Sequence, residues 1–286
     1  MTANATAPTT AGGHTSEFAR TSRTDRWWVG PVLTVIGLAV CVTYMTWAAF
    51  QAQHYWWGSY LSPLYSPVLF GSPEGTPGAA PAEHVLFGPW PSWWPPFIPA
   101  SPAFWILVFP GAFRFTCYYY RKAYYRSFTA TPPGCAVCPV RQTSYRGETR
   151  WLLFQNWHRY AMYFAVIFIF ILAYDALISF VRVDPVTGAK QFGIGVGSLV
   201  LTLNVVLLSG YTFGCHSFRH VIGGGRNRFS GASGKPSLFY RIWQKASWLN
   251  ARHMLFAWTS LYWVTFCDFY IRMVSMGYIR DYNTWD

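Results

Sequence analysis

The sequence predicts an all-α membrane protein, a bundle of five transmembrane helices. Of its 286 residues, 52% are hydrophobic and only 11% are charged, whereas soluble domains are roughly 25% charged. Apolar stretches of about 20 residues are long enough to cross the hydrocarbon layer of a bilayer. Five such stretches occupy residues 28–50, 103–125, 151–180, 193–219 and 249–277.

The segments outside these stretches differ in composition. Residues 1–26 form a polar tail, rich in Thr, Ala and Gly at its start, which we expect to be disordered and cytoplasmic. Residues 27–286 then form one transmembrane anchor domain. Its first apolar stretch exceeds the length of a signal-peptide core and follows the polar tail, so we interpret it as a retained helix. The Trp- and Pro-rich segment 51–102 is predicted to be an external loop that rests as a lid on the outer interface.

Basic residues predict the orientation of the bundle. The net charge of +12 could suggest nucleic-acid binding, but six Lys or Arg lie within 121–150 and seven within 219–252, whereas 51–113 contains none. This asymmetry follows the positive-inside rule. It places the N-terminus and the segments after the second and fourth helices in the cytoplasm, and the C-terminus outside.

Most of the potential metal ligands gather at one predicted depth, in the cytoplasmic half of the bundle. Ionisable residues inside a membrane are costly and usually functional, so this group is a candidate metal site. Its members are Cys117, His158, Cys215, His216, His220 and His253.

Other cysteines carry weaker signals. A single Cys in an apolar helix is usually a packing residue, which is the simpler interpretation of Cys41 and Cys267. Cys135 and Cys138 form a CxxC in the predicted cytoplasmic loop. Because the cytoplasm is reducing, that pair is expected to be free, catalytic or metal-bound rather than a structural disulfide.

Two redox cofactors could use these residues. Haem b needs two axial His, and helical bundles supply such pairs from facing helices. A Rieske-type [2Fe-2S] cluster needs two Cys on one iron and two His on the other. The two intramembrane cysteines favour the Rieske-type cluster, because a haem pocket has no use for them. Zinc would accept the same four donors, but a structural zinc has little purpose inside a bundle.

The six candidates cannot all serve one metal equally well. His216 and His220 are spaced i, i+4 and share one helix face, whereas Cys215 points about 100° away from His216. One of these histidines is therefore free for a quinone site or a partner interface.

Five motifs resemble the single-subunit membrane anchor of actinobacterial succinate dehydrogenases. They are TCYYYRKAYYRSF (116–128), TPPGCAVC (131–138), QNWHRY (155–160), GCHSFRH (214–220) and NARHMLFAW (250–258). The resemblance covers roughly residues 27–280. It implies a bacterial plasma-membrane subunit of respiratory complex II, with a flavoprotein and an iron–sulfur subunit docked on the cytoplasmic face, that passes electrons from succinate to quinone. Five-helix anchors with two haems need His on both sides of the membrane, but here only His54 and His84 lie outside, which argues against a distal haem.

The remaining polar residues suggest a quinone site and a docking surface. Aromatic and basic residues at the inner interface could line a quinone site, with His216 or His220 as a proton donor: Tyr119, Tyr120, Tyr124, Trp151, Arg159 and Trp248. Basic residues that could pair with carboxylates of the partner subunits are Arg121, Lys122, Arg126, Arg141, Arg146 and Arg150. Asp268 and Arg272 are expected to form an i, i+4 ion pair.

Two other functions fit parts of the chain. A haem b-binding anchor, in complex II or in another quinone-linked oxidoreductase, would use the same histidines. A redox-silent transporter is the alternative from another class, but the predicted spans hold few acidic residues, chiefly Asp175 and Asp268, and no inverted repeat is visible.

Overall fold

The computed structural model describes residues 18–140, 152–183, 187–224, 230 and 234–285. The chain divides into two compact units. The smaller unit comprises residues 1–36 and 122–147, and the larger comprises residues 37–121 and 148–286. Helix α1 (Val29–Gln51) begins in the smaller unit and ends in the larger one.

The smaller unit pairs the N-terminal segment with the CxxC loop. Thr21 and Val137 form an antiparallel bridge, and the N–H of Cys138 donates to the carbonyl of Arg20 at 3.0 Å. Arg23 donates from Nη1 to the carbonyl of Cys135 at 3.0 Å and forms an ion pair with Asp25. These contacts join two segments that are over 100 residues apart in sequence.

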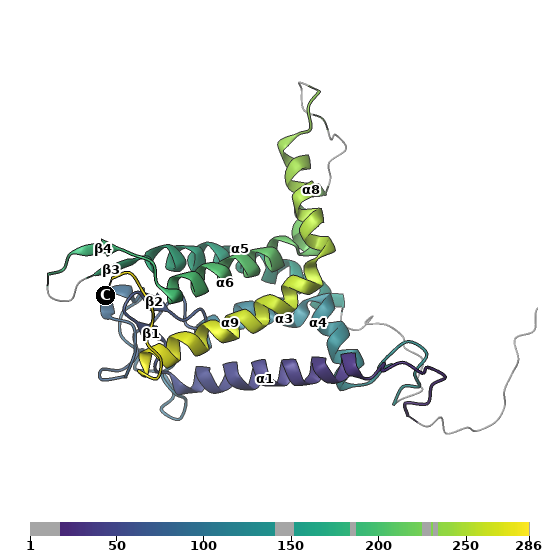
Figure 1. Ribbon diagram of the computed structural model, residues 1–286, viewed down its shortest axis with the longest axis horizontal. Coiled ribbons are helices and arrows are strands. Elements are labelled where there is room, and N and C mark those ends of the chain that lie inside the picture. Colours follow the sequence, from purple (N-terminus) through teal and green to yellow (C-terminus); the bar gives the residue numbers. More distant parts are fainter. Residues whose placement is uncertain (1–17, 141–151, 184–186, 225–229, 231–233, 286) are drawn as a thin grey trace, which may run out of the picture. The chain divides into compact units, whose positions relative to one another are not determined.

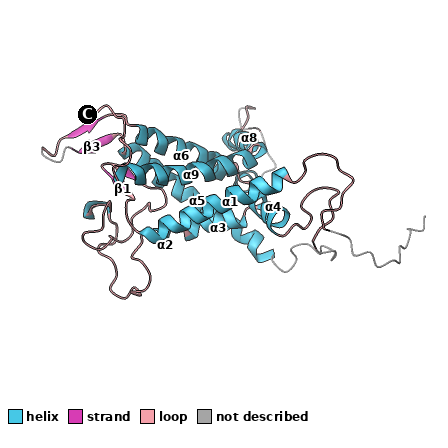
Figure 2. Ribbon diagram, turned by 60° about the horizontal axis from the view of Figure 1, so that its bottom comes forward, coloured by secondary structure: helices cyan, strands magenta, loops and turns pink. Residues whose placement is uncertain are grey.

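The larger unit is helical (Figures 1 and 2). Helices α5, α6 and α9 run side by side, and α3 packs on α5. Helix α8 runs across the direction of these helices, and the side chain of its N-cap residue, Ser237, accepts from the N–H of Tyr240. The helices after α1 are α2 (Ala103–Ile106), α3 (Val108–Thr116), α4 (Tyr118–Ala123), α5 (Leu152–Ile178), α6 (Val196–Phe213), α7 (His216–Gly223), α8 (Leu238–Ala251) and α9 (His253–Ser275).

Short elements complete the chain. Two antiparallel hairpins join β1 (Trp56–Trp57) to β2 (Tyr60–Leu61) and β3 (Val181–Val183) to β4 (Lys190–Phe192). A 3-10 turn spans Ala82–His84, and a π-helical turn, η2, spans Tyr124–Phe128.

Three helices in the described part of the chain are long and apolar enough to cross a membrane: Val29–Gln51, Trp157–Ile178 and Val196–Phe213. The apolar helix over Ala103–Thr116 is shorter. Helix α9 has 23 residues but carries Asp268 and Arg272. A mostly helical membrane protein is therefore confirmed, whereas five spans and the sides of the two termini stay predictions.

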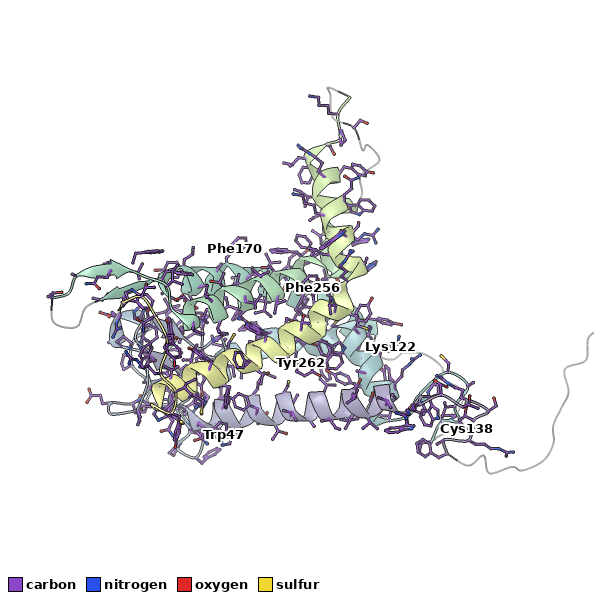
Figure 3. All side chains as sticks on the ribbon, viewed as in Figure 1. Trp47, Lys122, Cys138, Phe170, Phe256 and Tyr262 are labelled. Carbon is purple, nitrogen blue, oxygen red and sulfur yellow. The ribbon has the colours of Figure 1, made fainter. Side chains whose placement is uncertain are left out.

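The surface of the long helices is apolar. Phe170 on α5 is 66% exposed and points away from the neighbouring helices (Figure 3), and Ile167, Leu177, Leu199 and Val206 are also exposed. Large exposed apolar surfaces are rare on soluble monomers. These faces are suited to lipid.

Two predicted helices are interrupted, contrary to expectation. The segment 103–125 is not one helix, because α3 ends at Thr116 and α4 starts at Tyr118. The segment 193–219 ends its first helix at Phe213, and α7 starts at His216. The fifth predicted helix, 249–277, starts four residues before α9, which begins at His253, because residues up to Ala251 belong to α8. Apolar composition alone could not predict these breaks, since both sides of each break are suited to helix.

Small residues allow α6 to approach its neighbours closely. A Cβ at Gly210 would lie 2.5 Å from the ring of Phe256 on α9. A Cβ at Gly197 would lie 2.3 Å from the ring of Tyr60. Tyr262, also on α9, reaches α1 at Gly37 (Figure 3). Substituting these glycines would push the helices apart.

The predicted lid is partly built into the core. Tyr55, Tyr60 and Tyr65 are fully buried in the segment that follows α1, and Tyr55 and Tyr65 stack with ring centroids 4.3 Å apart. Burial raises the pKa of Tyr65 to about 12. The expectation of a lid resting on the surface is therefore wrong for this part of the loop.

Candidate metal centre

Two cysteines occupy the two helix breaks. Cys117 lies between α3 and α4 with ψ of 133°, and Cys215 lies between α6 and α7 with ψ of 139°. Each thiol-bearing residue is only 1% exposed. Each donates its N–H to the carbonyl three residues earlier and accepts at its carbonyl from the N–H of an arginine four residues later, Arg121 or Arg219. The two breaks therefore have the same local geometry and bury a thiol in the same way.

A histidine faces each cysteine. The Nε2 atom of His158, on α5, lies 3.1 Å from the Sγ atom of Cys215. The Nε2 atom of His253, the first residue of α9, lies 3.7 Å from the Sγ atom of Cys117. We call these four residues the thiol–imidazole site.

The surroundings of His158 select one tautomer. The hydroxyl of Thr116 donates to the carbonyl of Ala112 at 2.7 Å and lies 2.8 Å from Nδ1 of His158. A hydroxyl has one proton, so at the second contact it accepts, and Nδ1 carries the hydrogen. The lone pair of His158 is therefore on Nε2 and is directed toward Cys215, which is the arrangement that orients a metal-binding imidazole.

The imidazole of His253 is also incompletely satisfied. Its Nδ1 atom is buried and has no hydrogen-bond partner among the described residues, although the backbone of Tyr211 is near.

Aromatic rings cover both imidazoles. Phe113 stacks on His158 with centroids 4.9 Å apart and planes 5° apart. Tyr211 stacks on His253 at 4.9 Å and 14°. Phe113 and Tyr211 also contact each other at 5.0 Å. The rings form a continuous wall on one side of the site.

Arg114 is a polar residue that the sequence reasoning missed. Its Nη1 donates to Tyr120 Oη at 2.6 Å and to the Ala257 carbonyl at 3.1 Å, and its Nη2 donates to Ser260 Oγ at 3.0 Å. The guanidinium lies over the Tyr211 ring at 4.8 Å. Its position inside an apolar stretch was the available signal, because such a charge is functional by default.

An apolar cavity of about 350 Å³ adjoins the aromatic wall. Residues of α1, α2, α3, α5, α6 and α9 line it, together with two residues of the loop after β2. Phe113, Arg114, Tyr211 and Thr212 belong to its lining. A single ring thus separates this cavity from each imidazole.

The other residues predicted to form the site lie apart from these four. His216 and His220 are exposed on α7, so they do not close the fourth helix as expected. Arg159 is exposed, and the Tyr120 hydroxyl donates to the carbonyl of Ala257 at 2.5 Å. Tyr124 belongs to η2 of the smaller unit.

Several predicted residues lie outside the described part of the chain: Trp151, Arg141, Arg146 and Arg150. All six cysteines are described, and none of them forms a disulfide. Within the described ranges, no three His, Cys, Asp or Glu side chains come together as ligands of one metal ion. The thiol–imidazole site is instead two Cys–His pairs.

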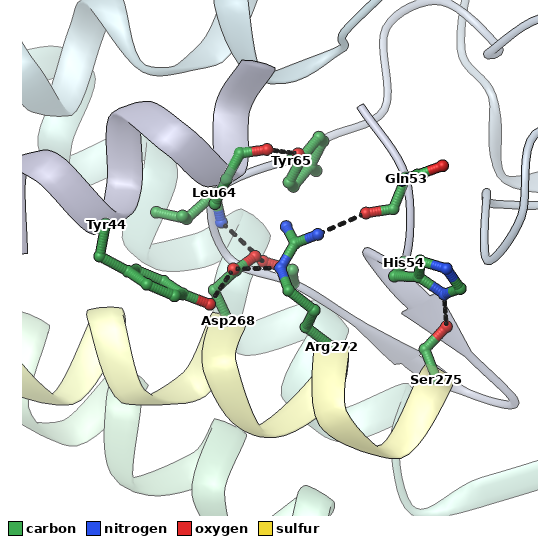
Figure 4. A network of polar contacts seen from close by, with 10 residues as sticks. Tyr44, Gln53, His54, Leu64, Tyr65, Asp268, Arg272 and Ser275 are labelled. Carbon is green, nitrogen blue, oxygen red and sulfur yellow. Dashed lines mark hydrogen bonds and ion pairs between the residues drawn. The ribbon is translucent and has the colours of Figure 1, made fainter. Parts of the chain in front are cut away.

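A second polar group surrounds Asp268 (Figure 4). Asp268 pairs with Arg272 at 3.3 Å, as the i, i+4 spacing predicted, and it accepts hydrogen bonds from Tyr44 at 2.7 Å and from Ser62. Arg272 donates to the carbonyl of Gln53 at 2.7 Å. We call these five residues the Asp268 network. It joins α1, the loop after it and α9.

Comparison with known proteins identifies the family of the chain. Residues 29–277 match the family described as actinobacterial succinate dehydrogenase subunit SdhC. The chain is 45% identical to a chain of the Mycobacterium smegmatis Sdh1 complex in the apo form, with a TM-score of 0.78, covering 94% of this chain and 95% of that chain. No curated protein matches. The chain therefore belongs to the actinobacterial succinate dehydrogenase SdhC family, the quinone-reducing membrane part of a complex II, and it partners the other subunits of that complex in the plasma membrane.

Proposed function

We propose that this subunit holds a Rieske-type [2Fe-2S] cluster through Cys117, Cys215, His158 and His253 and thereby links the iron–sulfur subunit to quinone. The observation that carries the proposal is that two buried thiols, the buried imidazole of His253 and the half-buried imidazole of His158 come from separate helical segments and form two contacting pairs. When bound, such a cluster supplies one-electron transfer.

The donor set fits this group in number and type. A Rieske-type centre takes two thiolates and two imidazoles shared between two irons, so it needs no set of three ligands around one ion. The tautomer of His158 leaves Nε2 free to bind, and Nδ1 of His253 is a buried nitrogen without a partner among the described residues.

Haem b is supported less well by the same geometry. An axial His must direct a ring nitrogen at the haem iron, with space for the macrocycle on both sides. Here the Nε2 atoms of both histidines face thiols at 3.1 and 3.7 Å. The redox-silent transporter is excluded by membership of the succinate dehydrogenase family.

The basic residues next to the site would bind the soluble subunits. Arg121 and Arg219 follow the two cysteines by one helical turn, and Arg241 and Lys245 are exposed on α8. In the proposed orientation, with the N-terminus cytoplasmic and the C-terminus outside, these cations face the cytoplasm. Carboxylates of the iron–sulfur subunit would then pair with them near the thiol–imidazole site.

The test is spectroscopic, on the purified complex. After reduction with succinate, we expect an EPR signal of low average g and no sharp α and β optical bands. The His158→Ala variant should lose the signal, whereas His220→Ala, a matched change of an exposed histidine, should keep it. Sharp α and β bands would mean haem and overturn the proposal, and zinc without iron in elemental analysis would also overturn it.

A further inference from the structure

Helix α8 carries apolar residues along one face, and only part of that face is covered. Positions i, i+4, i+8 and i+11 of a helix lie within about 80° of one another. In α8 these positions hold Leu238, Ile242, Ala246 and Leu249. Ala246 is only 3% exposed, whereas Leu238 is 60% and Ile242 is 36% exposed. The apolar face is therefore buried near the end of α8 and exposed at its start.

The buried part of this face packs on the end of α6. Asn250 donates from Nδ2 to the carbonyl of Gly214, the C-cap of α6, at 2.8 Å. A Cβ at Gly214 would lie 3.1 Å from the carbonyl oxygen of Leu249, so the two backbones are close. Figure 1 shows the start of α8 projecting away from α6 and α9. Leu238 and Ile242 thus extend the packed face beyond the helices that cover its end.

The position of α8 corresponds to a membrane surface. Helix α6 has 18 residues, so at about 1.5 Å per residue it is roughly 27 Å long, close to the ~30 Å thickness of the hydrocarbon core of a bilayer. The end of α6, where α8 packs, is therefore near the level of the lipid headgroups. Because α8 runs across the direction of α5, α6 and α9 (Figure 1), it lies along the plane of the bilayer when those helices cross it.

Cations and a tryptophan border the apolar face. Arg241 and Lys245 are exposed and lie about 60° and 20° from Leu238 around the helix. Trp248 is also exposed, and the guanidinium of Arg252 lies 4.0 Å from its ring centroid. Residues 219–252 contain seven Lys or Arg and no Asp or Glu. Cations and Trp around an apolar face are typical of helices that lie at the surface of an anionic membrane.

We infer that α8 lies in the headgroup region of the cytoplasmic leaflet, with Leu238 and Ile242 against acyl chains and with Arg241 and Lys245 at anionic phospholipid headgroups. The face that packs on the end of α6 is turned toward the membrane, and Leu238 and Ile242 share that face. The lipid that surrounds α5 and α6 then extends beneath the projecting part of α8. The leaflet follows from the proposed orientation, in which this basic segment is cytoplasmic.

The iron–sulfur subunit is the competing occupant of the apolar face. It docks from the aqueous side, and the side of α8 opposite to the apolar face holds the exposed polar residue Gln244. Arg241 and Lys245 lie at the boundary between the two sides. Because their side chains are long, they can reach lipid phosphates as well as carboxylates of the partner. The apolar face itself is directed at the bilayer.

An anchored α8 would fix the depth of the chain on both sides of it. Helix α7, which starts directly after Cys215, precedes α8, and α9 begins with His253 directly after it. Contact between α8 and lipid would therefore hold two members of the thiol–imidazole site at a constant distance from the membrane surface. The contact needs no bound metal, so it does not depend on the cluster.

Lipid photolabelling of the purified wild-type complex tests the inference. The complex is placed in nanodiscs of phosphatidylcholine and phosphatidylglycerol, and one lipid at a time carries a diazirine near the start of an acyl chain. We expect label on the peptide 238–245 as well as on the exposed face of α5, with more label on α8 from phosphatidylglycerol. Label on α5 without label on α8, or equal label on α8 from the two lipids, would overturn the inference.

Cross-linking from the apolar face tests the competing occupant directly. With p-benzoylphenylalanine in place of Ile242, we expect cross-links to lipid. Cross-links to the iron–sulfur subunit instead of lipid would overturn the inference.

Matched charge changes separate the two sides of α8. Ile242→Glu should lower the lipid label on α8 about tenfold, because a charge replaces an apolar side chain in contact with acyl chains. Gln244→Glu places the same charge on the opposite side and should leave the label unchanged. Equal label in the two variants would overturn the inference. Copurification of the soluble subunits checks that each variant is assembled.

The cations have their own variant. Arg241→Gln combined with Lys245→Gln should lower the preference of α8 for phosphatidylglycerol over phosphatidylcholine roughly fivefold for each cation, which corresponds to ~1 kcal/mol per charge near an anionic surface. An unchanged preference would overturn the assignment of these side chains to anionic headgroups.

Discussion

The thiol–imidazole site and the Asp268 network differ in how their ionisable side chains are paired. Both bury ionisable side chains in a helical unit with an apolar surface. In the Asp268 network, the charge of Asp268 is met by Arg272 and by two hydroxyl donors. In the thiol–imidazole site, donors face one another in pairs, and Nδ1 of His253 has no partner among the described residues.

The difference separates a structural group from a functional one. In the network, the charge of Asp268 is paired with the opposite charge of Arg272, so neither needs a ligand, although Nη2 of Arg272 is buried without a hydrogen-bond partner among the described residues. In the thiol–imidazole site there is no such pair of opposite charges, and a buried donor set of thiols and imidazoles is stabilised when a ligand completes it. We therefore expect substitutions in the network to lower stability, and substitutions in the thiol–imidazole site to remove a bound group.

The largest effect should follow loss of a cysteine at a helix break. Cys117→Ser and Cys215→Ser each should abolish the EPR signal and nearly all succinate–quinone activity, because a hydroxyl is a poor ligand for iron in a sulfide cluster. Cys41→Ser is a matched control, since Cys41 is also buried but lies in α1. Loss of the EPR signal in Cys41→Ser would contradict this prediction. Retention of the signal in both Cys117→Ser and Cys215→Ser would also contradict it.

The next effect should be on stability. Asp268→Ala leaves the guanidinium of Arg272, which is 0% exposed, buried without its counter-ion, and breaking such a pair costs about 3–5 kcal/mol. The thermal midpoint of the purified complex should fall while the EPR signal per folded complex stays the same.

The double variant Asp268→Ala/Arg272→Met is the control for this prediction. It removes both charges, so it should recover much of the lost stability. If Asp268→Ala lost the EPR signal without loss of stability, the Asp268 network would serve the redox centre. It would then not differ in function from the thiol–imidazole site.

The smallest effect concerns His54, which lies at the edge of the Asp268 network. Its Nδ1 lies 3.2 Å from Ser275 Oγ (Figure 4), and burial, with a smaller effect of the Arg272 charge, lowers its pKa. A folded-state pKa below the unfolded value of about 6.5 means that the unfolded chain binds the proton more readily. The part of the free energy of unfolding that depends on neutral His54 is therefore fully present above about pH 6.5, and it is lost as the pH falls below that value.

Thermal midpoints of the complex at pH 7.5 and 5.5 would measure this effect. The fall between the two pH values should be smaller in His54→Gln than in wild type, whereas His84→Gln, in the same loop, should behave as wild type. If the thermal midpoint fell equally in His54→Gln and in wild type, His54 would not contribute to the pH dependence of stability.

The sequence by itself determined the class of the protein and its family. Low charge and long apolar stretches follow directly from composition, so the helical membrane protein was predictable. The motifs around Cys117, His158, Cys215 and His253 indicated the family that the comparisons then showed. The Asp268–Arg272 pair was also predictable, because i, i+4 neighbours on a helix lie within reach of each other.

Only the tertiary structure decided which of these residues meet. His216 and His220 looked equivalent to His158 and His253 in sequence, but a break at Cys215 turns α7 away from α6 and leaves them exposed. The two breaks, the role of Arg114 and the cavity depend on contacts between distant segments. Helical periodicity places a side chain on a face, but the dihedral angles at a break and the space between helices are set by packing across the whole unit.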